Sequence, residues 1–126
     1  MTTLLSSNYN KCILINIPNS MSVLEDLIPF IPIILEKKLT GIFNLVNTSV
    51  ITHRQILEMY KYYINPNYEY TIISEAEQNL KVLAPRSNCH LSNDKISQYM
   101  YVPNIRNSIE LLFKKWNKSL QKYHLN

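Results

Sequence analysis

The chain has 126 residues, of which 46% are hydrophobic and 17% are charged, and this composition argues against disorder and suits one domain with its own core. Its 13 basic residues outnumber its 9 acidic residues, so the net charge of +4 is compatible with a phosphate-bearing ligand and only weakly indicates nucleic acid. Two scattered cysteines, no signal-peptide pattern and no apolar run long enough for a membrane lead us to expect a cytoplasmic protein.

The first predicted elements are a strand and a helix interrupted by prolines. Residues 12–17, CILINI, form a short and mostly apolar run that suits a strand buried on both faces. A capping box at Ser22 predicts a helix whose apolar residues extend over 22–35. Two prolines interrupt that helix, and an interior proline costs about 3 kcal/mol. We therefore expect a kink or a restart near Phe30.

The middle of the chain alternates between strand and helix signals. Residues 41–46, GIFNLV, predict a second strand, and residues 68–73 predict a third. Capping boxes begin the helices predicted over 52–64 and 74–81. Strand, helix, strand, helix, strand and then helices is an α/β order.

Two further helices are predicted near the C-terminus. The first spans 92–100, and the second begins after Asn104. The apolar face of the second consists of Ile105, Ile109, Leu112, Phe113 and Trp116. Strands 12–17 and 41–46 resemble parallel strands that need neighbours on each side, so the sequence predicts a piece of a larger sheet.

Glycine occurs once, as Gly41. Loops that cradle phosphate groups need two or three glycines, because the backbone has to approach the phosphate with no Cβ in the way. Neither GxGxxG nor GxxxxGK exists in this sequence. We therefore expect the chain to bind no dinucleotide or nucleoside triphosphate by those means.

The motif APRSN contains the strongest candidate for ligand binding, Arg86. A guanidinium group matches phosphate oxygens bidentately, and the preceding proline stiffens the approach to it. Ser87 and Asn88 add short polar groups, so this turn suits an anionic ligand such as a diphosphate. The alternative is an ion pair of Arg86 with Glu75 or Glu77, and the residues alone leave both possibilities open.

Other reactive residues give no comparable signal. The side chains of the adjacent Cys89 and His90 point apart in extended backbone, which disfavours a catalytic pair. The three histidines show no metal-ligand spacing with either cysteine. Most of the nine tyrosines lie in or beside predicted elements, where a half-buried ring is ordinary. We predict no catalytic and no metal-binding residue.

Three runs of sequence carry a resemblance to a known family. They are NIPNSMSVLEDLIP (16–29), LTGIFNLVNTSVITHRQILEMYKYYI (39–64), and APRSN followed by HLSNDKI (90–96). Together they resemble the C-terminal portion of the nucleotide-sugar 3,5-epimerase/4-ketoreductases of rhamnose biosynthesis, over about residues 7–118. Those enzymes act on UDP- or dTDP-4-keto-6-deoxyglucose. They are related to dTDP-4-dehydrorhamnose reductase, in the extended short-chain dehydrogenase/reductase superfamily.

The resemblance implies that half of an enzyme is missing here. In that family the N-terminal half is a Rossmann domain with a glycine-rich loop for NADPH and a Tyr-x-x-x-Lys pair. No tyrosine of this chain has a lysine four positions later. Residues 1–126 would then be one substrate-binding region with the last strands of a Rossmann-type sheet, its ends 1–10 and 119–126 flexible. Alone, it should lack redox activity.

The resemblance also assigns site residues. An arginine in the corresponding turn faces the nucleotide diphosphate, which implies this role for Arg86, with Asn88 and Ser87 as polar contacts. Asn19 and Ser20 resemble a second segment that lines the sugar-nucleotide cleft.

Two positions depart from the family pattern. Thr48-Ser49 stands where relatives often have Pro-Gly, and Cys89-His90 where they tend to have Asn-Glu. The implied partners are a nucleotide-diphosphate sugar and a separate Rossmann-domain chain or full-length homologue, with no nucleic acid and no membrane. The alternative function is a non-catalytic interaction module, or a decayed fragment, that associates with a full-length homologue.

Overall fold

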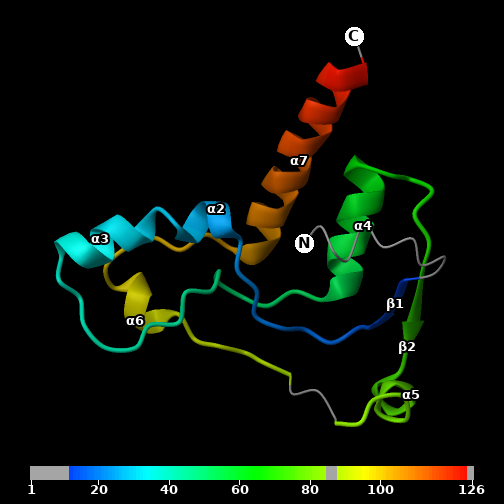
Figure 1. Cartoon of the computed structure of the whole chain (residues 1–126), viewed down its shortest axis with the longest axis horizontal. Helices are drawn as coiled ribbons and strands as arrows, with labels where there is room; N and C mark the ends of the chain where they lie inside the picture. Colours follow the sequence, from blue (N-terminus) through cyan, green and yellow to red (C-terminus); the bar gives the residue numbers. More distant parts are fainter. Residues whose placement is uncertain (1–11, 85–87, 125–126) are drawn as a thin grey trace.

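The computed structural model of the protein describes residues 12–84 and 88–124. These residues form a mixed α/β structure, which confirms the predicted class (Figure 1). The elements in chain order are β1 (Cys12–Ile15), α2 (Leu24–Leu27), α3 (Phe30–Glu36), α4 (His53–Tyr63), β2 (Tyr70–Ile73), α5 (Glu75–Asn79), α6 (Asp94–Ser97) and α7 (Ile105–His124). Residues 1–10 lie outside the described part, and α7 continues through 119–124.

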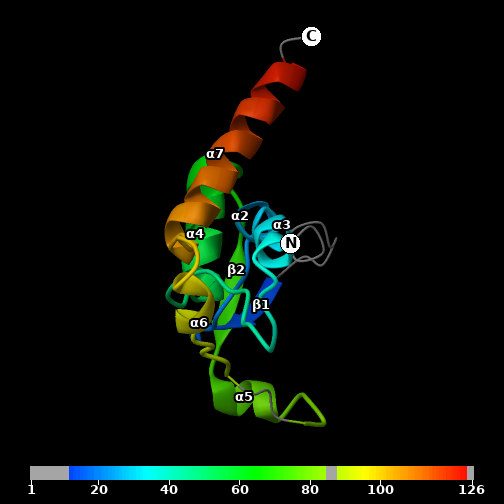
Figure 2. The same ribbon diagram turned by 90° about the vertical axis from the view of Figure 1, so that its left-hand side faces the viewer.

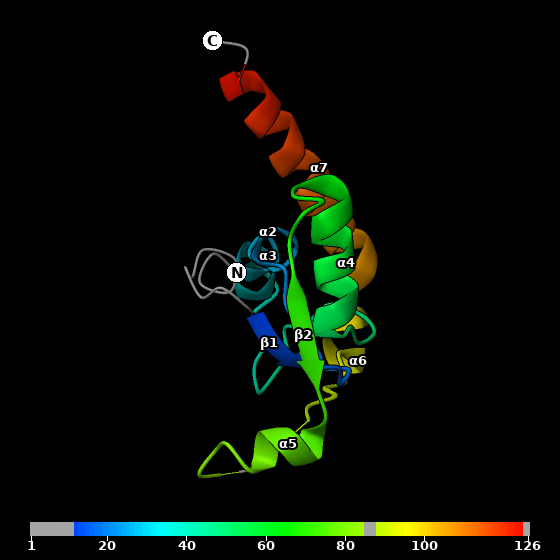
Figure 3. The same ribbon diagram turned by 90° about the vertical axis from the view of Figure 1, so that its right-hand side faces the viewer.

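The described strands form one small parallel sheet. β1 pairs with β2 in a register that places Cys12 opposite Tyr70 and Ile15 opposite Ile73. α4 lies along this sheet, beside β2 (Figure 3). Side chains alternate between the two faces of a strand, so Leu14 of β1 is buried while its neighbour Ile13 is 54% exposed. α4 therefore covers one face of the sheet.

The helix predicted over 22–35 divides as expected, but it begins differently. α2 ends at Leu27 and α3 begins at Phe30, which confirms the restart at the prolines. The predicted capping box at Ser22 is wrong, because Val23 occupies the N-cap and makes no side-chain cap. The Ser22 hydroxyl donates instead to the carbonyl of Leu45, at 2.8 Å. A long-range contact replaces the local cap.

The strand predicted over 41–46 is not formed. Among the described residues no strand lies beside this segment, and the two-stranded sheet consists of β1 and β2. Its apolar residues Phe43 and Leu45 pack against a core cluster without strand pairing. Pattern alone predicted a strand here, but a strand requires a neighbour to accept its hydrogen bonds.

Two predicted capping boxes are present. Thr52 accepts a hydrogen bond from the Gln55 amide while the Gln55 side chain accepts one from the Thr52 amide, and α4 begins there. Ser74 and Glu77 make the same exchange at the start of α5. α5 has no buried residue and lies at one end of the molecule, away from the other helices (Figure 2).

Two apolar clusters form the core. The larger joins α4 and α7, which lie side by side (Figure 1), and it contains Val23, Ile51, Ile56, Met59, Tyr60, Ile105, Ile109 and Phe113. The smaller contains Leu27, Phe30, Ile96 and Val102. The predicted apolar face of the last helix is confirmed at Ile105, Ile109 and Phe113, which are almost completely buried.

Candidate functional site

Two segments singled out in the sequence lie against each other. The loop after β1 carries Asn19 and Ser20, and the segment after the APRSN motif begins at Asn88. The Cys89 amide donates to Asn19 Oδ1 at 2.7 Å, and the Leu91 amide donates to Ser20 Oγ at 2.8 Å. The Ser20 amide donates to the Cys89 carbonyl at 2.8 Å. Three hydrogen bonds thus hold together segments about 70 residues apart in sequence.

The Asn19 backbone is itself anchored on the core. Its amide donates to the Ile51 carbonyl and its carbonyl accepts from the Ile51 amide, both at 3.0 Å. Ile51 is 1% exposed, so this bridge ties the loop to the larger cluster. The side-chain oxygens of Asn19 and Ser20 are occupied by backbone amides, which makes both residues supports of the 88–91 segment.

The predicted diphosphate contacts fall only partly within the described structure. Arg86 and Ser87 lie outside the described residues, and Asn88 is exposed beside the support just described. The alternative ion pair with Glu75 or Glu77 is therefore open. Glu77 already accepts hydrogen bonds from the Ser74 amide and hydroxyl, and the amide bond is the main cause that lowers the pKa of its carboxyl. Glu77 thus has a role as a cap that does not need Arg86.

The turn after β1 is not a glycine-rich loop of the kind that holds a dinucleotide, because it contains proline, asparagine and serine. Gly41 has a φ of +103°, and a Cβ there would lie 3.1 Å from Lys95 Nζ, so this glycine serves a local turn. Within the described ranges, no group of three or more His, Cys, Asp or Glu side chains could hold a metal ion.

Ser49 has a φ of +72°, in the left-handed region that glycine favours. Asn104 Nδ2 donates to the Ser49 hydroxyl at 3.1 Å, and the Ile105 amide donates to the Thr48 carbonyl at 3.0 Å. The turn keeps the backbone shape expected of glycine and is held to the start of α7.

Sequence reasoning missed a polar groove between α4 and α7. It has a volume of about 430 Å³, and two of the chain's three arginines, Arg54 and Arg106, line it. Glu110 lies in the same groove and accepts hydrogen bonds from the Tyr63 hydroxyl and from Lys114 Nζ, both at 2.8 Å. The hydrogen bond from Lys114 is the main cause that lowers the pKa of Glu110, and the bond to Glu110 raises the pKa of Tyr63. Only the pairing of the two helices could reveal this groove.

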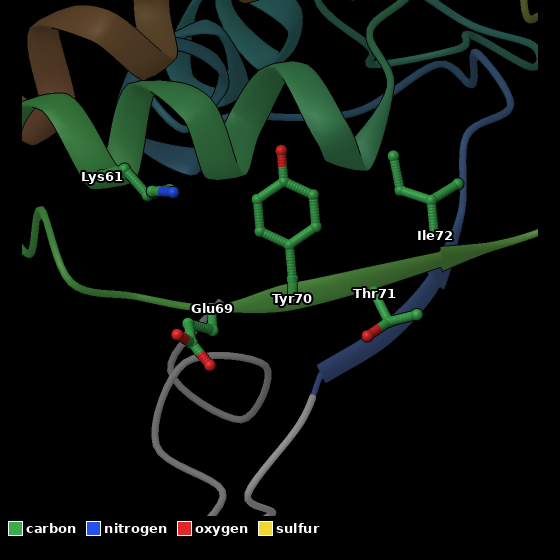
Figure 4. A pocket seen from close by; sticks show the side chains of 5 residues that line it. All are labelled: Lys61, Glu69, Tyr70, Thr71 and Ile72. Carbon is green, nitrogen blue, oxygen red and sulfur yellow. The ribbon is translucent and has the colours of Figure 1, made fainter.

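A second hollow, of about 600 Å³, lies between α4 and β2 (Figure 4). The Tyr70 ring points from β2 toward α4, and its hydroxyl donates to Glu58. Burial, and then this hydrogen bond, raises the pKa of Tyr70. Lys61 Nζ lies 5.9 Å from the centre of the same ring. Of the residues predicted from the sequence to bind substrate, the structure describes Asn19, Ser20 and Asn88, and none of these three lines either hollow.

Known proteins resemble the chain over most of its length. It is 41% identical over 92 residues to a trifunctional UDP-glucose 4,6-dehydratase/UDP-4-keto-6-deoxy-D-glucose 3,5-epimerase/UDP-4-keto-L-rhamnose-reductase of Arabidopsis thaliana. The matched region is 73% of this chain and 14% of that protein. It is 39% identical over 90 residues to a bifunctional dTDP-4-dehydrorhamnose 3,5-epimerase/dTDP-4-dehydrorhamnose reductase of the same plant, covering 71% and 29% respectively. No protein-family model matches the chain.

A solved structure agrees with these sequence matches. The crystal structure of the UDP-rhamnose synthase from Acanthamoeba polyphaga mimivirus superposes with a TM-score of 0.79 at 32% identity, over 90% of this chain and 39% of that one. The chain is homologous to one segment of the rhamnose-synthesis epimerase/reductases. The family resemblance noted in the sequence is thereby confirmed. This rhamnose-synthase segment spans between 14% and 39% of the length of these relatives.

Within residues 12–84 and 88–124, none of the helices has both the length and the apolar character needed to cross a membrane.

Proposed function

We propose that the chain is the C-terminal, substrate-binding portion of an NADPH-dependent nucleotide-sugar epimerase/reductase that makes UDP- or dTDP-L-rhamnose. The observation that carries this proposal is the match to a UDP-rhamnose synthase over 90% of the chain, at 32% identity and a TM-score of 0.79. In this proposal the chain is the substrate-binding lobe of an extended short-chain dehydrogenase, and it works in the cytoplasm. That β1 and β2 complete a Rossmann-type sheet stays a prediction.

The proposed role of this lobe is to bind the sugar nucleotide and not to transfer hydride. The guanidinium of Arg86 binds the diphosphate bidentately, and Asn88 and Ser87 donate further hydrogen bonds. Asn19 and Ser20 support this proposal because they fix the segment that follows the turn, through the bonds to the Cys89 and Leu91 amides. NADPH and the proton donor belong to another region of polypeptide, since the chain has neither a glycine-rich loop nor a Tyr-x-x-x-Lys pair.

That other region is the second proposed partner, either a Rossmann-domain chain or a full-length homologue. Its support is the difference in length, because the mimivirus enzyme has most of its chain outside the matched 39%.

Titration of the chain with UDP, followed by calorimetry and by amide chemical shifts, tests the proposal. UDP should bind and shift the amides of residues 88–91. Replacement of Arg86 by alanine should weaken binding roughly 10- to 100-fold, because hydrogen bonds to a charged group contribute about 1.5–3 kcal/mol. The matched controls are Arg54→Ala and Arg106→Ala, which remove the same charge in the α4–α7 groove and should leave the affinity unchanged.

Equal affinity of wild type and Arg86→Ala would refute the diphosphate role of Arg86. No binding of UDP by the folded wild-type chain would refute the substrate-binding function. Capture of a full-length homologue by a chain that does not bind UDP would then favour the non-catalytic interaction module.

A further inference from the structure

The polar groove between α4 and α7 has walls that follow helical spacing. Arg54, Glu58 and Tyr62 are four residues apart on α4, so their side chains lie in one line along that helix. Arg106 and Glu110 form a corresponding line on α7, which lies beside α4 (Figure 1). These five residues line the groove together with Gln55, Met59 and Tyr63. The wall on α4 extends about 12 Å at 1.5 Å per residue, which suits a short stretch of chain better than a single ion.

Both glutamates of the groove are bound within the chain. The carboxylate of Glu110 accepts hydrogen bonds from the Tyr63 hydroxyl and from Lys114 Nζ, both at 2.8 Å. The carboxylate of Glu58 accepts one from the Tyr70 hydroxyl. The negative charges that line the groove are therefore partly compensated before any ligand approaches.

The two arginines of the groove have no carboxylate partner of this kind. The ion pairs that the described residues form involve lysines, and neither Arg54 nor Arg106 takes part in them. Arg54 lies near the Tyr70 hydroxyl and opposes the rise in its pKa that burial mainly causes. Arg106 contributes to the lowered pKa of Glu110, after the two groups that donate to that carboxylate. A guanidinium group has several donors, so each arginine keeps donors for a carboxylate from outside the chain.

The groove also has the composition of a surface that binds protein. Tyr62 is 79% exposed, and its ring stands edge-to-face against the Tyr63 ring with 4.8 Å between their centres. Met59 contributes an apolar side chain below them. Arginine, tyrosine and methionine are enriched where proteins bind one another, and lysine is depleted there. Lysine is the commoner basic residue of this chain, yet the described residues that line the groove include two of its three arginines and no lysine.

The two glutamates restrict how the charge of a ligand can be distributed. A dense anion such as a polyphosphate would approach Glu58 and Glu110 as closely as the arginines, and like charges in contact are unfavourable. Carboxylates on separate side chains can reach Arg54 and Arg106 without that repulsion. An apolar side chain between them can pack on the exposed ring of Tyr62. These requirements describe an acidic peptide segment that contains an apolar residue.

We propose that the α4–α7 groove is a docking site for an acidic segment of a partner protein, whose carboxylates bind Arg54 and Arg106 while an apolar side chain packs on Tyr62. This inference goes beyond the proposed function, because the groove is separate from the support of the 88–91 segment. Neither Asn19 nor Ser20 lines it. Docking of the acidic segment should therefore leave the binding of UDP unchanged.

Titration with a synthetic peptide that has one leucine between pairs of glutamates tests the proposal, with amide chemical shifts and calorimetry as readouts. The shifts should map to the groove residues of α4 and α7. Arg54→Ala and Arg106→Ala should each weaken binding about fivefold or more, because charge-assisted hydrogen bonds are lost from an exposed site. Tyr62→Ala should weaken it to a similar extent, since aromatic residues contribute strongly at protein contacts. All three side chains are exposed, so the variants should fold, which urea denaturation checks.

Two controls separate the groove from general attraction to a basic protein. Lys118→Ala removes an exposed positive charge from α7 outside the groove and should change the affinity by less than about twofold, because salt screens a distant charge. A peptide with glutamine in place of every glutamate should not bind. Equal losses in Lys118→Ala and the two arginine variants, or shifts that map outside the groove, would overturn the proposal. The absence of any shift with the acidic peptide would overturn it as well.

Further arms of the experiment test the other possible occupants of the groove. Inorganic phosphate that displaces the peptide at equal concentration would assign the groove to small anions and overturn the peptide proposal. Shifts of the groove residues that grow with chain concentration, without peptide, would assign it to self-association. The UDP titration stays independent, because a chain that binds UDP and ignores the peptide retains the proposed function and loses only the docking site.

Discussion

At the scale of single residues, the side chain of Asn47 connects parts of the chain that are far apart in sequence. It is 1% exposed, accepts from the Val23 amide at 2.7 Å and donates to the Asp26 carboxylate at 2.8 Å. Asn47→Ala leaves both groups unpaired, so we expect the free energy of unfolding to fall by about 2–4 kcal/mol in urea denaturation. The control is Asn44→Ala, which removes one exposed bond to the Ser92 carbonyl and should cost about 0.5 kcal/mol. Equal losses would contradict this role of Asn47.

The hydroxyl of Ser20 gives a prediction for the proposed binding site. Ser20→Ala removes the acceptor of the Leu91 amide, which should loosen the 88–91 segment and weaken UDP binding several-fold, roughly 3- to 10-fold. Ser22→Ala is a matched control, because Ser22 lies in the same loop and its hydroxyl makes an equally long bond of 2.8 Å, to the Leu45 carbonyl. Calorimetry should show an affinity change for the first variant only. A similar change in both would mean that the loop as a whole, and not the Ser20 bond, matters.

The pKa of Glu110 predicts a pH dependence. Lys114, and then Tyr63, donates to its carboxylate and lowers its pKa below the ordinary value. A carboxyl whose pKa is lowered by folding contributes stability above its unfolded pKa, and this contribution is lost as the pH falls through the folded pKa. The side chain of Glu110 is only partly buried and still contacts solvent, so the effect on stability is small. Carboxyl titration by NMR should show the pKa of Glu110 rising in Lys114→Met, and rising less in Tyr63→Phe. The reverse order would contradict the assigned causes.

At the scale of elements, the two capping boxes should have different consequences. Thr52 begins α4, which packs in the larger core, so Thr52→Ala should lower the free energy of global unfolding by about 1 kcal/mol. Ser74 begins α5, which buries no residue, so Ser74→Ala should fray α5. The free energy of global unfolding should stay within about 0.5 kcal/mol of that of wild type. Urea denaturation measures the first, and amide exchange in α5 measures the second. A large global loss in Ser74→Ala would show that α5 is coupled to the core.

Elements with local causes were predicted well from the sequence. The restart at Phe30 follows from proline geometry, and the caps at Thr52 and Ser74 follow from residues three positions apart. The strand at 41–46 and the cap at Ser22 failed because each depends on a distant group. The first needs a neighbouring strand, and the hydroxyl of Ser22 binds the carbonyl of Leu45 instead of its own helix.

The candidate site divides in the same way. The resemblance named Asn19 and Ser20, and the structure places them against residues 89–91, a proximity that no spacing in the sequence indicates. Neither the groove lined by Arg54 and Arg106 nor the hydrogen bonds of the Asn47 side chain could be predicted. The groove forms only when α7 packs beside α4, and the bonds of Asn47 form only when α7 packs beside the 47–48 turn. The roles of Arg86 and Ser87 stay predictions.

At the scale of the whole molecule, the sequence contains neither a glycine-rich loop nor a Tyr-x-x-x-Lys pair, and the proposed function assigns hydride transfer to another region of polypeptide. Hydride transfer requires a site that holds the nicotinamide ring against the sugar and a group that protonates the sugar oxygen. The one glycine lies in a turn beside Lys95, and the loop after β1 presents Asn19 and Ser20 toward the 88–91 segment. The purified chain, mixed with NADPH and UDP-4-keto-6-deoxyglucose, should therefore consume NADPH no faster than buffer does.

A binding experiment makes that negative result informative. NADPH should leave the amide spectrum of the chain unchanged, whereas UDP should shift residues 88–91, since only the diphosphate-binding part of the site is expected here. Oxidation of NADPH by the chain alone would contradict the division of labour between two regions of polypeptide. Equal shifts with UDP and with an unrelated diphosphate would indicate that the turn recognises the diphosphate without reading the nucleoside.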